Sequence, residues 1–258
     1  MAGQVTFSKG GAIATVVIDN PGRLNALSLP MWRQLRDVFK GLSADETLRC
    51  VVLRGAGDAF AAGADIAEFE SERHDVDSAR KYGEAVHAAL DAISDCRHPV
   101  VALIKGACVG GGLEIVARVD LRICGESARF GIPVNRLGAV VAYQEMKPLV
   151  QIAGPAVALE ILIEGAIIKA ADAERKGLVN RVVADRVVED EVYATAHRIA
   201  DGAPLVARWH KKFVRRLLDP KPLSAAELDD NYACFATEDF QTGYRSFLEK
   251  KKPEFKGR

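Results

Sequence analysis

Two short segments near the start of the chain, residues 5–7 and 13–18, are rich in apolar and β-branched residues typical of strands. The intervening Ser8-Lys9-Gly10-Gly11 is typical of a tight turn, so the pattern predicts a β-hairpin. Short apolar runs that continue without alternation predict buried strands. Such runs occur at 51–54, 100–104 and 119–124.

Helical periodicity separates these strands and dominates the second half of the chain. In 78–95, Val86, Leu90 and Ile93 recur on one face, as in an amphipathic helix. After residue 143 strand signals nearly disappear, apart from 179–183. Further helices are expected at 28–42, 143–153, 155–163, 186–201, 204–218 and 224–237. The change predicts an α/β fold with a core at residues 1–195 and a helical C-terminal region at 196–258.

Composition narrows the classes of protein without selecting one. The chain has 258 residues, 49% of them hydrophobic, enough for one substantial core. Lys+Arg and Asp+Glu both number 35, so the net charge of +0 attracts neither nucleic acid nor an anionic membrane. No apolar run approaches the ~20 residues of a membrane span, and no signal-peptide pattern opens the chain. We expect no nucleic-acid or membrane partner, a cytoplasmic location and, from five scattered cysteines, no metal site.

Two segments rich in glycine and alanine, 55–66 and 105–114, each follow a buried strand. Small residues let a ligand approach backbone N–H groups, and two facing turns could hold one oxygen between them. The second turn is expected to open a helix, whose N-terminus adds partial positive charge. This chemistry suits enolate formation from a carbonyl compound. A dinucleotide fingerprint fits less well because Phe60 replaces its third glycine, and close packing alone is the other interpretation.

These segments resemble the crotonase (enoyl-CoA hydratase/isomerase) superfamily, through Ala61-Ala62-Gly63-Ala64-Asp65-Ile66 and Lys105-Gly106-Ala107-Cys108-Val109-Gly110-Gly111-Gly112-Leu113-Glu114. Further agreement in order and spacing comes from residues 21–27, Phe130-Gly131-Ile132-Pro133 with Leu137-Gly138, and 247–255. The resemblance spans nearly the whole chain. It implies a spiral of ββα units, an acyl-CoA substrate, and homotrimers or dimers of trimers formed through the helical C-terminal region.

Carried over position by position, the resemblance assigns roles to individual residues. It places the N–H donors to the thioester oxygen on Ala64 and Gly111, and the principal acid–base group on Glu114. The implied contacts to the adenine and pantetheine of CoA, the last two from a neighbouring subunit, fall on Leu24, Ala62, Ala64, Ile66, Phe247 and Lys250. Because CoA is part of the substrate thioester, the resemblance implies no separate cofactor.

One position departs from the pattern of the hydratases. They use a second glutamate after the Phe-Gly-x-Pro motif, where this chain has Val134, which cannot move a proton. Tyr143 and Glu145 could supply the missing group, although the first turn of a helix is the simpler interpretation of both. We therefore expect slow hydration of simple enoyl-CoA. An enoyl-CoA isomerase, an acyl-CoA decarboxylase and a non-catalytic CoA-ester-binding protein remain as alternatives.

Overall fold

The computed structural model describes residues 3–258. Met1 and Ala2, the first residues of the segment expected to lack a signal-peptide pattern, lie outside the described residues. The main sheet has the strand order β1-β2-β3-β4-β6-β9. In the part of this sheet that residues 3–258 form, β1 and β2 pair in antiparallel fashion and the other neighbours are parallel, which confirms the predicted hairpin. The strands are β1 (Gln4–Gly10), β2 (Ile13–Asp19), β3 (Cys50–Gly55), β4 (Val100–Ile104), β6 (Leu121–Gly125) and β9 (Arg181–Val183).

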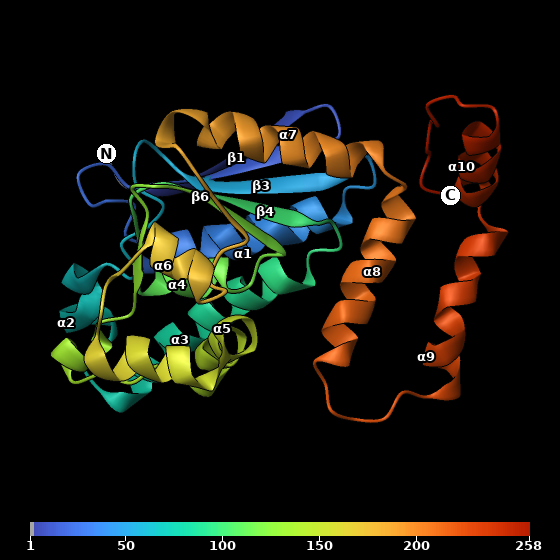
Figure 1. Ribbon diagram of the computed structural model, residues 1–258. Coiled ribbons are helices and arrows are strands. Elements are labelled where there is room, and N and C mark those ends of the chain that lie inside the picture. Colours follow the sequence, from blue (N-terminus) through green and yellow to red (C-terminus); the bar gives the residue numbers. More distant parts are fainter. Residues whose placement is uncertain (1–2) are drawn as a thin grey trace.

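Helices cover both faces of this sheet (Figure 1). Successive side chains of a strand point to opposite faces, so Val51 and Leu53 join one apolar cluster and Val52 joins the other. The first cluster includes α1 (Leu29–Ala44) and α3 (Val76–Asp95). The second includes α7 (Val188–Asp201), which lies along the opposite face. Burial on both faces explains why these strands are continuous apolar runs.

A second, smaller sheet lies beside the first and has the strand order β5-β7-β8. Its strands, β5 (Ala107–Val109), β7 (Arg129–Gly131) and β8 (Ile168–Lys169), hold two or three residues each. Such short segments carry no alternation that a sequence pattern could reveal. The helices α4 (Gly111–Val116) and α6 (Ala170–Arg175) follow β5 and β8 directly.

Helix α5 (Tyr143–Glu164) joins the two helices expected at 143–153 and 155–163 across a kink at Gly154, whose φ is 79°. Its 22 residues are long and apolar enough on average to cross a membrane by length and composition alone, although charged residues such as Glu145, Lys147 and Glu160 interrupt the apolar sequence. Leu149 and Ile161 anchor the helix in the core. Shorter helices complete the region, namely η1 (Ile66–Glu68), α2 (Phe69–Glu72), η2 (Val134–Leu137) and η3 (Asp185–Val187).

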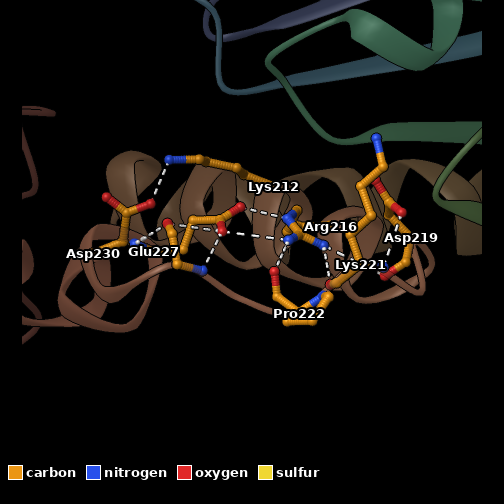
Figure 2. A network of polar contacts seen from close by, with 8 residues as sticks. Lys212, Arg216, Asp219, Lys221, Pro222, Glu227 and Asp230 are labelled. Carbon is orange, nitrogen blue, oxygen red and sulfur yellow. Dashed lines mark hydrogen bonds and ion pairs between the residues drawn. The ribbon is translucent and has the colours of Figure 1, made fainter.

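The last part of the chain is helical and extends away from the sheet (Figure 1). It contains α8 (Pro204–Leu217), α9 (Ala225–Asp229), η4 (Asp230–Ala236) and α10 (Glu238–Leu248). Figure 2 shows how Arg216 of α8 ties the turn to α9, donating to Pro222 O at 2.9 Å and to Glu227 at 3.3 Å. The α/β core followed by a helical region is confirmed. The division at residue 195 stays a prediction, and α7 runs through it.

Candidate active site

The two glycine-rich turns meet at one edge of the main sheet. Strands β3 and β4 are parallel neighbours, so the turns that leave their carboxyl ends begin side by side. A β-bridge between Ala61 and Cys108 then joins the turns. Val109 N donates to Ala61 O and Ala61 N donates to Ala107 O, both at 2.9 Å. The facing arrangement that the sequence analysis required is present.

Only glycine fits at the point of closest approach. Gly63 has a φ of 99°, in the region that favours glycine. A Cβ on Gly63 would stand 3.0 Å from Val109 O and 3.2 Å from Gly111 N. On the other turn, a Cβ on Gly111 would stand 2.9 Å from Cζ2 of the buried Trp32. The backbones of the two turns are therefore in direct contact.

The N–H groups of Ala64 and Gly111 lie on these facing turns. Leu27 N donates to Gly63 O at 2.7 Å and Asp65 N donates to Leu27 O at 2.9 Å, so the N–H of Ala64 between them points away from Leu27. Gly111 is the first residue of α4, whose N–H has no partner within the helix. Within residues 3–258, neither N–H donates a hydrogen bond. Two unused donors therefore occupy adjacent turns.

Four of the residues expected to contact CoA gather around the first turn. Ala62 N donates to Leu24 O at 2.9 Å, and Ala64 pairs with Leu27. The large apolar side chains of Leu24 and Ile66 are 61% and 58% exposed beside this turn. They form an apolar rim at the entrance to the two donors.

Asn25 holds this rim in place. It is buried and has a φ of 59°. Its side chain accepts from Asn20 N at 3.1 Å and donates to Ala56 O and Ala59 O at 2.9 and 2.8 Å. The remaining two expected contacts, Phe247 and Lys250, belong to the C-terminal region, whose α10 lies far from α2 in Figure 1. One chain does not bring them to the rim.

Glu114 lies one turn into α4, and its N–H donates to Gly110 O at 3.0 Å. Its side chain is partly buried, between the buried Leu113 and Ile115 in sequence, and its carboxyl group makes no hydrogen bond to any residue in 3–258. Burial, followed by the charge of Glu145, raises the pKa of Glu114 to about 8, while Arg73 and Arg118 oppose the rise. Burial and the Glu145 carboxylate therefore favour the protonated form of Glu114, which lies three residues after the Gly111 donor on α4.

Arg73 is a cation near this carboxyl group. Its guanidinium lies 4.7 Å from the ring centroid of Phe69 and 4.6 Å from that of Tyr82. It pairs with no carboxylate in the part of the chain described. Tyr82 is buried, which raises its pKa to about 12. The two aromatic rings hold the Arg73 guanidinium in place. No pattern in the sequence indicated that this cation lies near Glu114.

The positions considered for a second acid–base group differ in their surroundings. Val134 is partly buried and packs against the apolar core, and Tyr143 is 90% exposed. The Glu145 side chain, only 14% exposed, contacts His87 of α3 at 3.0 Å and lies close enough to Glu114 to raise its pKa. Its helix-start position was recognised from the sequence, but its neighbours were not. Among residues 3–258, no three side chains of metal-ligand type gather at one place.

Comparisons with known proteins agree with this geometry. Residues 8–258 match the family model described as enoyl-CoA hydratase/isomerase. A probable enoyl-CoA hydratase from Rhizobium meliloti is 34% identical, over 96% of each chain, and a crotonyl-CoA hydratase from Syntrophomonas wolfei is 31% identical over 98% of this chain and 97% of its own.

Solved structures extend the likeness to the whole fold. A protein from Magnetospirillum magneticum described as an enoyl-CoA hydratase/carnithine racemase has a TM-score of 0.97 and 48% identity, covering 98% of this chain and 96% of its own. A putative enoyl-CoA hydratase/isomerase family protein from Hyphomonas neptunium has a TM-score of 0.94 and 34% identity, covering 98% of both. The expected crotonase-like fold is confirmed. This chain belongs to the enoyl-CoA hydratase/isomerase family of the crotonase superfamily and is an enzyme of that family.

Proposed function

We propose that this enzyme stabilises the enolate of an acyl-CoA thioester between the N–H groups of Ala64 and Gly111, and that Glu114 moves the α-proton. The observation that carries the proposal is the pair of unused backbone donors on two turns in direct contact, with a protonated carboxyl group one helical turn away. These are the three elements that enolate chemistry requires.

The donors contribute because they are fixed before the reaction begins. Contact between the turns prevents either N–H from reorienting, and the N-terminus of α4 adds its partial positive charge on the Gly111 side. Donors arranged in this way act most strongly on charge that develops in the transition state. Removal of one such donor typically costs about 2.7–4 kcal/mol of transition-state stabilisation.

Glu114 is suited to exchange a proton with the α carbon. Because its pKa is about 8, both protonation states are accessible near neutral pH. A group whose pKa lies near the working pH serves as acid in one direction of a reaction and base in the other. Hydration and decarboxylation both end with protonation of a thioester enolate at the α carbon, whereas double-bond isomerisation begins with removal of the α-proton and passes through a conjugated enolate.

Hydration of an enoyl-CoA is the reaction that the relatives favour, since the names of several describe enoyl-CoA or crotonyl-CoA hydratases. Val134 favours the alternatives, because a single base suffices for an isomerase and loss of CO₂ itself forms the enolate in a decarboxylase. A CoA-ester-binding protein without turnover would retain the rim and lack exchange of the α-proton.

The assembly belongs to the same proposal. We infer a homotrimer or dimer of trimers, in which Phe247 and Lys250 approach the CoA bound to a neighbouring subunit. Phe247 and Leu248 are 83% and 74% exposed at the end of α10, and Ile163 of α5 is 69% exposed. Apolar surface of this kind gains free energy when another subunit covers it.

Exchange of the α-proton with solvent tests the proposal without assuming which reaction is native. The enzyme is incubated with butyryl-CoA in D₂O, and loss of the α-proton signal is followed by NMR. We expect exchange by the parent and a loss of roughly 10²–10⁴-fold in Glu114→Gln. Glu84→Gln, an exposed glutamate on α3, is the matched control. Saturable binding of butyryl-CoA without exchange by the parent would overturn the proposal.

A further inference from the structure

We propose that Glu145, held in place by His87, is the second acid–base group of this enzyme and acts at the β carbon of an enoyl thioester. The inference rests on the proposed function, since it assigns Glu145 a role beside Glu114 at the same site. None of the motifs that carry the family resemblance includes this position. It lies eleven residues beyond Val134, in a different element.

Both carboxyl oxygens of Glu145 are oriented by the protein. His87 Nε2 on α3 donates to Oε1 at 3.0 Å, and Ala142 N at the start of α5 donates to Oε2 at 2.9 Å. The side chains of Glu145 and His87 are 14% and 21% exposed. Each oxygen retains a second lone pair, so the carboxylate is fixed in orientation and still able to accept a proton.

Contacts among three helices place Glu145 beside Glu114. Helix α4 packs against both α3 and α5, and Arg118 lies in the turn that directly follows α4. Its guanidinium donates to Gln144 O at 2.8 Å on α5 and to Asp91 Oδ1 at 3.2 Å on α3. Because Gln144 directly precedes Glu145, the same contact that joins α4 to α5 brings the two glutamates together. The two side chains are close enough for the charge of Glu145 to raise the pKa of Glu114.

Helix capping alone does not account for a carboxylate at this position. The cap uses only Oε2, and a glutamine would accept the same hydrogen bond from Ala142 N. A carboxylate adds repulsion toward the partly buried Glu114, a cost that glutamine would avoid. Two carboxyl groups at one site, in different surroundings, are a usual arrangement of an acid and a base.

The pair accounts for every proton in a hydration. Glu145, as the carboxylate, takes a proton from water while the water oxygen bonds to the β carbon. The electron pair of the C=C bond moves toward the thioester, whose oxygen lies between the N–H groups of Ala64 and Gly111. Glu114, as the acid, gives its proton to the α carbon. The proton on Glu145 then passes to Glu114, which restores both groups.

The test compares two reactions of one variant, Glu145→Gln. Hydration of crotonyl-, hexenoyl- and decenoyl-CoA is followed by loss of enoyl thioester absorbance, and α-proton exchange of butyryl-CoA is followed in D₂O. We expect the parent to hydrate at least one enoyl-CoA. In the variant, we expect kcat for hydration to fall roughly 10²–10⁴-fold, with exchange within a few-fold of the parent. Glutamine retains the cap, so the variant should fold.

Glu84→Gln, which replaces an exposed glutamate on α3, is the control, and this variant should leave hydration unchanged. For His87, a positioning residue, His87→Gln retains a donor and should hydrate faster than His87→Leu. Parental rates in Glu145→Gln would overturn the inference. The inference would also be overturned if the parent enzyme exchanged the α-proton but hydrated no enoyl-CoA, which is the result expected if Val134 leaves the site without a second acid–base group. A parent without exchange refutes the proposed function itself.

Discussion

Replacing Glu114 with glutamine should lower activity and raise stability in the same variant. In the unfolded chain Glu114 ionises near its ordinary pKa of 4.5, whereas in the folded chain burial and Glu145 raise that pKa to about 8. Below pH 4.5 both states hold the proton and the group has no effect. Between these values unfolding releases the proton, so the stability of the parent falls as pH rises, and it levels off above pH 8.

The size of the effect follows from the same two values. At about 1.4 kcal/mol per pH unit, the interval sets an upper bound of about 5 kcal/mol. Glu114 keeps partial solvent contact and shares the effect with Glu145, so we expect roughly 2–4 kcal/mol in practice. Glutamine has the same shape without the charge, and the variant should escape this loss of stability.

Urea unfolding of parent and Glu114→Gln between pH 4 and pH 9 measures the difference directly. The two should be nearly equal at the acidic end, and the variant should become the more stable as pH rises toward 8. Glu84→Gln, on an exposed part of α3, provides the control and should show no such divergence. A stability difference that stays constant with pH would refute the assignment of a raised pKa to Glu114.

Three further substitutions test the framework around the site. Gly111→Val should destabilise the fold by roughly 1–3 kcal/mol in thermal melting, because the valine side chain would meet the buried Trp32. The same variant should slow α-proton exchange, followed by NMR, by about 10²–10³-fold. Val134→Glu should lower stability in urea and leave hydration of crotonyl-CoA unimproved, because it places a carboxylate against the apolar core; a clear gain in hydration would contradict this. Asn25→Ala, which removes three hydrogen bonds from the rim, should weaken binding of CoA esters in calorimetry more than it slows exchange at saturation.

Much of the core can be predicted from local pattern. Strands β3 and β4 are recognisable because both faces of a parallel sheet are buried, which makes each strand a continuous apolar run. The second sheet is not, since β8 has only two residues and exists through its pairing with β7. The kink in α5 also depends on the backbone geometry at Gly154, which periodicity does not encode, whereas the amphipathic pattern and the Thr237 cap of α10 were a local signal for that helix.

For the site, the sequence by itself determined which residues can form the two turns. Glycine is required where Gly63 adopts a positive φ and where Gly111 meets Trp32, and Glu114 follows at a constant distance along one helix. The tertiary structure decided what surrounds that glutamate. His87 and Glu145 are 58 residues apart and meet only because α3 and α5 both pack against α4 and approach each other there. A local pattern specifies a helix and its apolar face, but the position of one helix against another depends on the packing of the whole core.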